Sequence, residues 1–149
     1  MREGSNFKAC IPGGASTPYL TKEHWDLSLD FDPVARAGSR LGTGGIIVFD
    51  QNSCMVAATL NLIRFYARES CGWCTPCREG LPYVQHILER IEAGKGMIGD
   101  IPILREHVQL LNYAFCALAP GAMGPLEGLL RHFEDELREH ISSKRCPFR

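Results

Sequence analysis

The chain has 149 residues, 45% hydrophobic and 22% charged, which is enough length and apolar content to bury a globular core. With 16 basic and 17 acidic side chains its net charge is −1, so we expect no nucleic-acid partner. It contains no apolar run of the roughly 18–20 residues that a membrane-spanning helix needs, and its first residues show no apolar signal core. We therefore expect no direct membrane insertion and no export.

Residues 1–52 are mixed in composition and rich in glycine. Residues 7–11 predict a short strand that ends at a Pro-Gly-Gly turn, and residues 46–49 predict a second strand. Residues 18–40 have weak periodicity and predict irregular structure. The glycines at 42–45 lead into a strand, whereas a nucleotide-binding loop leads out of one, so we interpret them as a turn. Two or three short strands are too few for an independent sheet, and this segment is expected to be part of a larger unit.

Residues 53–149 have a different, helical pattern. Four segments carry apolar residues at helical spacing, namely residues 55–66, 81–91, 104–111 and 126–141. A Pro- and Gly-rich stretch at 120–125 predicts a break before the last helix, and residues 142–149 predict a frayed tail. Four helices with short connections predict an antiparallel bundle. The expected fold class is therefore α+β.

The strongest chemical signal is a group of three cysteines, Cys71, Cys74 and Cys77, in a loop between two predicted helices. Seven cysteines, an odd number, in a chain without an export signal favour metal or redox chemistry over disulfides. Three closely spaced thiolates with a distant fourth are typical of a [4Fe–4S] cluster. Gly72 allows the backbone to approach a cluster closely, and the following helix presents its positive end to an anionic group.

Cys116 is the candidate for the fourth ligand, at the predicted end of a helix before a Pro-Gly turn. The competing interpretation is a buried core cysteine. Cys54, which precedes a helix, and Cys146, in the basic tail, are weaker candidates, and Cys10 is assigned to a strand. None of these three has a partner at ligand spacing, and replacing Cys146 with serine is expected to be silent.

Two other functions stay open from the residues alone. The segment from Trp73 to Cys77 matches the W-C-x-P-C pattern of thiol–disulfide oxidoreductases, in which Cys74 and Cys77 would be the reactive pair. That motif belongs after a strand, whereas a helix is predicted before it here. A structural zinc site of four thiolates is the second alternative, although zinc usually takes two separated Cys-x-x-Cys pairs. The histidines are scattered, with His132 and His140 on a charged helix surface, and no catalytic acid, base or nucleophile is predicted.

Residues 69–80, which contain the three cysteines, resemble the cluster motif of the NADH-binding flavoprotein subunit of respiratory complex I, the NADH:quinone oxidoreductase. Residues 115–122 resemble that family's fourth-ligand segment, residues 38–48 the stretch ahead of its helical domain, and residues 12–14 a turn of its small β-grasp domain. The resemblance implies a partial β-grasp (SLBB-like) segment at 1–52 and a helical iron–sulfur domain at 53–149. It also implies that the four cluster ligands are Cys71, Cys74, Cys77 and Cys116.

The resemblance further implies a role in electron transfer, from reduced FMN through a [4Fe–4S] cluster to further clusters. In that family FMN and NADH are bound by a larger N-terminal domain that this chain lacks, so no enzymatic activity is expected of these residues alone. The implied partners are the flavin- and NADH-binding domain or chain and other iron–sulfur subunits. The implied location is the cytoplasm, the cytoplasmic face of the inner membrane or, in a eukaryote, the mitochondrial matrix. The equivalent modules of NAD-linked hydrogenases and formate dehydrogenases are alternatives.

Overall fold

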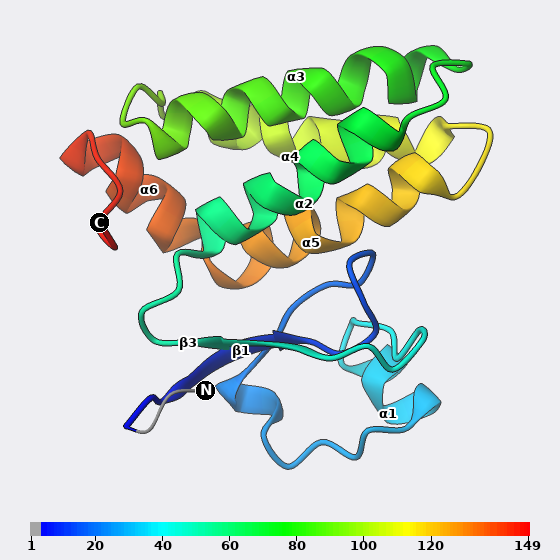
Figure 1. Ribbon diagram of the computed structural model, residues 1–149, viewed down its shortest axis with the longest axis vertical. Coiled ribbons are helices and arrows are strands. Elements are labelled where there is room, and N and C mark those ends of the chain that lie inside the picture. The colour runs from blue at the N-terminus through cyan, green and yellow to red at the C-terminus, as the bar shows by residue number, and fades with distance from the viewer. Residues whose placement is uncertain (1–3) are drawn as a thin grey trace.

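The structure is a computed structural model that describes residues 4–149, in which a layer of helices covers one face of a small sheet (Figure 1). The elements in chain order are β1 (Phe7–Ile11), β2 (Leu20–Thr21), the 3-10 turn η1 (Lys22–His24), α1 (Phe31–Arg36), β3 (Ile47–Asp50), α2 (Met55–Glu69), α3 (Thr75–Glu92), α4 (Asp100–Leu110), the 3-10 turn η2 (Leu111–Tyr113), α5 (Leu118–His132) and α6 (Glu134–Ser143). The predicted α+β class is confirmed. No helix of the described residues combines the length and apolar character needed to cross a bilayer.

The sheet is antiparallel, with β1 in the centre and the order β2-β1-β3. The predicted strand at 7–11 is confirmed, and the second strand begins one residue later than expected, at Ile47. The prediction of irregular structure at 18–40 is wrong in part, because β2, η1 and α1 lie there. These elements are too short to show periodicity in the sequence, and α1 depends on a cap, since the Asp30 side chain accepts a hydrogen bond from the Phe31 N–H.

The helices and the sheet share one hydrophobic core. Ala9 and Ile11, on alternate positions of β1, are fully buried together with Ile63 of α2 and Leu88 of α3. In Figure 1, α2 and α5 lie nearest the sheet and α3 lies on the far side of the bundle. The predicted boundary between residues 52 and 53 falls in the connection from β3 to α2.

The predicted break at 120–125 is wrong, because α5 runs without interruption through both prolines. Pro120 lies in the first turn, where no intrahelical partner is required of its nitrogen. The glycines serve packing instead: a Cβ on Gly124 would lie 2.9 Å from the carbonyl carbon of Ser16, and a Cβ on Gly128 would lie 2.6 Å from the backbone nitrogen of Tyr19. These glycines allow α5 to touch the backbone of residues 16–19, a tertiary contact that overrides the local preference for a turn.

The C-terminal region differs from its prediction in two ways. The expected single helix at 126–141 is divided at Phe133, whose ring packs edge-on against Tyr19 with 5.9 Å between centroids. The tail at 142–149 is not frayed, since Lys144 adopts a left-handed conformation that ends α6 and Cys146 is buried. A Cβ on Gly94 would clash with the carbonyl of Lys144, so this glycine provides the room for the tail to pack on the end of α3.

Candidate metal centre

The loop between α2 and α3 places three cysteines around the start of a helix. Helix α2 ends at Glu69, and Gly72 then turns the backbone with a positive φ of 74°, which costs glycine little. Cys74 is the N-cap of α3 and Cys77 lies in its first turn, so both sulfurs are close to the unpaired backbone N–H groups of a helix start. Cys71 is exposed in the loop, whereas Cys74 and Cys77 are buried.

The three-cysteine loop is fixed by polar contacts of its own. The Ser70 hydroxyl lies 3.1 Å from the Cys77 sulfur and accepts a hydrogen bond from the Gly72 N–H at 3.2 Å. The Arg78 guanidinium donates to the Gly72 carbonyl at 3.1 Å and so holds the loop from the side of α3. These contacts keep the three cysteines together at one end of the bundle.

The segment that carries Cys116 lies near the three-cysteine loop. Its segment follows η2 and leads into α5, with Ala117 as the N-cap, so the prediction that Cys116 ends a helix is wrong and it precedes one instead. The pKa of the Cys74 thiol is lowered, and the nearby backbone N–H of Phe115 is the main cause. A Cβ on Gly80 would lie 2.7 Å from the Leu111 side chain, which shows how closely η2 packs on α3 just ahead of Cys116.

The other three predicted ligands, Cys71, Cys74 and Cys116, all lie within electrostatic range of the Cys77 thiol. Burial raises the pKa of Cys77, and negative charge on Cys74, Cys116 and Cys71 raises it further, while the Ser70 hydroxyl acts in the opposite direction. Four thiols grouped in this way repel one another when ionised, unless a cation or a metal cluster neutralises them.

The edge of the site is open. Cys71 and Cys116 are exposed, and so are the large side chains beside them, with Trp73 78%, Tyr113 78% and Phe115 81% exposed. The Trp73-Cys74-x-Pro76-Cys77 pattern follows α2 and not a strand, so it lacks the β-α-β setting that a thioredoxin-like site requires.

The remaining cysteines divide into two kinds. Cys10 lies in β1 as predicted. Cys54 and Cys146, which have no partner at ligand spacing in the sequence, come together in space with Glu92 and His140. The placement of His140 on a charged surface is therefore wrong, since its side chain is fully buried. No spacing signal marks this group in the sequence, because its four members come from four separate elements.

Comparison with known proteins decides the family. The family model described as the NADH-ubiquinone oxidoreductase-F iron-sulfur binding region matches residues 57–140, which is more than half of the chain. The chain belongs to this family. The matched residues include Cys71, Cys74, Cys77 and Cys116, and the resemblance stated from the sequence motifs is confirmed.

Individual proteins of this family are similar in sequence to the chain. The chain is 46% identical over 149 residues to the F subunit of the NADH-quinone oxidoreductase of Streptomyces coelicolor, a match that covers 99% of this chain and 33% of that protein. It is 47% identical over 143 residues to the corresponding protein of Escherichia coli, covering 95% of this chain and 32% of that protein. The chain thus spans about a third of the length of the curated relatives it matches.

The same fold occurs in a hydrogenase. The crystal structure of an NAD+-reducing [NiFe]-hydrogenase in the H2-reduced state matches with a TM-score of 0.77 and 28% sequence identity, over 95% of this chain and 24% of that chain. The iron–sulfur region of the family is therefore similar in fold to part of a related redox enzyme, as expected from the sequence.

Proposed function

We propose that the chain binds one [4Fe–4S] cluster through Cys71, Cys74, Cys77 and Cys116 and carries electrons within an NADH:quinone oxidoreductase of the complex I type. One observation carries the ligand assignment: η2 packs on the start of α3, where a Cβ on Gly80 would lie 2.7 Å from the Leu111 side chain, so the segment that leads to Cys116 lies against the helix that bears Cys77. When bound, such a cluster accepts and releases one electron at a time.

The chain's own residues would hold and tune that group. Four thiols form the donor set that a [4Fe–4S] cluster requires, and Cys74 and Cys77 lie at the start of α3, whose positive end would stabilise negative charge on their sulfurs. The Ser70 hydroxyl is placed to donate to the Cys77 sulfur, and Arg78 fixes the loop backbone through Gly72. Because hydrogen bonds to sulfur set the reduction potential of iron–sulfur centres, these residues are the proposed tuning groups.

The electron route is proposed from the relatives. Electrons would arrive singly from FMN that NADH has reduced, both bound outside these 149 residues, and would leave to iron–sulfur clusters of neighbouring subunits. The exposed Trp73, Tyr113 and Phe115 beside Cys71 and Cys116 would supply contact area for such a neighbour. We assign no hydride chemistry to the chain itself and place it on the cytoplasmic side of the membrane, or in the matrix of a mitochondrion.

The domain division is part of the proposal. Residues 1–52 would form a partial β-grasp segment that supports the bundle, and residues 53–149 would form the helical unit that holds the cluster. A thiol–disulfide oxidoreductase remains the alternative class, favoured only by the Trp-Cys-x-Pro-Cys pattern itself.

Anaerobic reconstitution of the full chain with iron and sulfide tests the proposal. We expect about four irons and four sulfides per chain and the paramagnetic signal of a reduced [4Fe–4S] cluster after dithionite treatment. Cys116→Ser should lose iron as severely as Cys74→Ser, whereas Cys10→Ser is the matched control and should keep it. An intact cluster in Cys116→Ser would refute the ligand assignment, and disulfide reductase activity without iron would support the alternative.

A further inference from the structure

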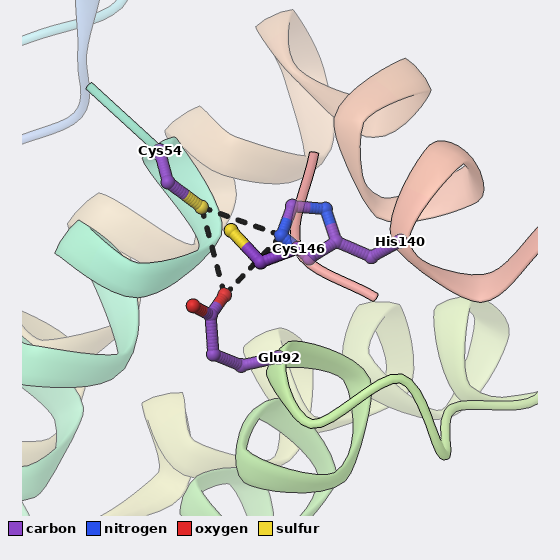
Figure 2. A group of neighbouring side chains, drawn as sticks. All are labelled: Cys54, Glu92, His140 and Cys146. Carbon is purple, nitrogen blue, oxygen red and sulfur yellow. Dashed lines mark hydrogen bonds and ion pairs between the residues drawn. The ribbon is translucent and has the colours of Figure 1, made fainter. Parts of the chain in front are cut away.

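A second group of potential metal ligands lies at the other end of the bundle. Figure 2 shows Cys54, Glu92, His140 and Cys146 pointing toward one another, and one ligand atom from each lies within 4.8 Å of all the others. Cys54 is the N-cap of α2, Glu92 is the last residue of α3, His140 lies in α6 and Cys146 lies in the tail. Helix α3 separates this group from Cys74 by 18 residues, or about 27 Å at the usual rise.

The distances fit a tetrahedron around a small cation. The Cys54 sulfur lies 3.5 Å from Glu92 Oε2 and 3.4 Å from His140 Nε2, and these two atoms lie 3.2 Å apart. Metal–ligand bonds of about 2.0–2.3 Å in tetrahedral geometry separate neighbouring ligand atoms by about 3.3–3.8 Å. The same three distances are also compatible with hydrogen bonds among a thiol, an imidazole and a carboxylate, so zinc analysis distinguishes a bound cation from a hydrogen-bonded network.

Two of the ligand atoms are oriented by contacts outside the group. His140 Nδ1 lies 2.6 Å from the Glu136 carbonyl oxygen, which can only accept a hydrogen bond. The ring proton of neutral His140 is therefore on Nδ1, and the lone pair of Nε2 points toward the other three ligands. The Cys54 sulfur accepts the Ala57 N–H at 3.3 Å, at the positive end of α2, which stabilises negative charge on the sulfur.

Burial and charge also suit a cation. His140 is fully buried and the Glu92 side chain is 10% exposed, so a carboxylate here is largely removed from water. Glu92 Oε1 is buried and accepts no hydrogen bond from the described residues, although the Arg149 guanidinium lies 3.2 Å away. Two thiolates and one carboxylate around a divalent cation leave one net negative charge, which Arg149 is placed to offset.

We propose that Cys54, Glu92, His140 and Cys146 bind one Zn²⁺ as a structural site. Two sulfur donors and an imidazole select zinc over magnesium or calcium, and four protein ligands leave no open position for catalysis. The ion would join the start of α2, the end of α3, α6 and the tail. Cys54 and Cys146 lie outside residues 57–140 that the family model matches, whereas Glu92 and His140 lie inside that range.

Zinc analysis and zinc-edge X-ray absorption of the full chain test the proposal. The chain is purified without chelators, and the Cys74→Ser/Cys116→Ser variant is analysed in parallel to remove the four-thiol site as a zinc ligand set. In both we expect about one zinc per chain with two sulfur and two nitrogen or oxygen neighbours. Because this readout does not involve iron, it stands whether or not the proposed electron-transfer function is correct.

Substitutions assign the ligands. Cys54→Ser and Cys146→Ser should each reduce zinc to background, while Cys10→Ser, a half-buried cysteine in β1, should leave it unchanged. Cys146 lies in the tail beyond the last helix, so its variant should fold even if the Cys54 variant does not, as circular dichroism would show.

Three results would overturn the proposal. If the folded wild-type chain contains zinc only at background level, Cys54, Glu92, His140 and Cys146 form a buried hydrogen-bonded network and not a metal site. Zinc surrounded by four sulfurs and lost in Cys74→Ser/Cys116→Ser would place the ion in the three-cysteine loop. A chain about two mass units lighter under non-reducing conditions, with Cys54 and Cys146 linked, would identify a disulfide in place of a metal.

Discussion

The two ends of the helical bundle carry cysteine groups of opposite character. At one end Cys71 and Cys116 are exposed and surrounded by exposed aromatic side chains. At the other end His140 and Cys146 are buried, and Cys146 itself comes from the C-terminal tail. An electron carrier needs an edge that a partner can approach, whereas a site that only stabilises a fold is best enclosed. The difference in exposure therefore supports two different roles for chemically similar ligands.

The largest expected effect on stability follows from removing the proposed cluster from the end of the bundle that carries Cys71 and Cys116. Removing the reconstituted cluster with an anaerobic chelator should lower the thermal midpoint by roughly 10 °C, because a ligand present at about 1,000 times its dissociation constant contributes about 4 kcal/mol. Hydrogen exchange should accelerate in residues 70–77 and 111–118 and stay slow around Cys54 and His140. Equal midpoints with and without the cluster would contradict the coupling of this end to folding.

A substitution in α5 tests whether the packing of the bundle on the loop between β1 and β2 affects stability without affecting the two cysteine groups. Gly124→Ala places a methyl group against the Ser16 backbone and should destabilise the chain by about 1–3 kcal/mol, measured by urea denaturation. Gly99→Ala is the control, since no heavy atom lies within 4 Å of its added Cβ. Iron and zinc contents should be unchanged in both variants. A neutral Gly124→Ala would mean that α5 does not pack closely on the backbone of residues 16–17.

The hydroxyl beside Cys77 offers a finer test of the open end. Ser70→Ala removes a hydrogen bond to sulfur, so the cluster should become harder to reduce, with a potential lower by roughly 20–60 mV for a bond worth about 0.5–1.5 kcal/mol. A redox titration followed by electron paramagnetic resonance measures the shift. Ser142→Ala, in α6 near the other end, should leave the potential where it is. A rise in potential for Ser70→Ala would argue against the proposed tuning.

The smallest effect is expected on the exposed surface between α2 and α3, one helical turn before Glu92, where Arg64 of α2 pairs with Glu89 of α3 at 2.9 Å. Hydrogen bonds from Gln85 and then Arg64 lower the pKa of Glu89 from its ordinary 4.5. The stabilisation is therefore present above pH 4.5 and is lost as the pH falls through the lowered folded-state value. Because the pair is exposed, Arg64→Gln should cost under about 1 kcal/mol at neutral pH and flatten the acid side of the stability profile.

The control for this pair is Arg68→Gln, whose partner Glu69 is its neighbour in the chain. Its stability should match wild type throughout the pH range. Identical acid profiles for Arg64→Gln and wild type would show that the contact between α2 and α3 is made by the core alone.

The sequence drew attention to the cysteines at the open end and gave no signal for the group at the enclosed end. Cys71, Cys74 and Cys77 are close in the sequence, so their spacing alone predicted that they lie together between two helices, and those helices followed from apolar periodicity. Cys54, Glu92, His140 and Cys146 are brought together only by the packing of α6 and the tail, which spacing does not encode. The uninterrupted α5 was missed for a related reason, since its glycines at 124 and 128 are required by a distant backbone and not by a local turn.

The contact of α5 with residues 16–19 has a further consequence for how the chain comes apart. Two backbones that touch through glycine have no flexible side chains between them, so the contact cannot separate gradually through side-chain rearrangement. The sheet and the bundle should then melt in one cooperative transition, and a protease cut between β3 and α2 should leave the two pieces associated until the whole chain denatures.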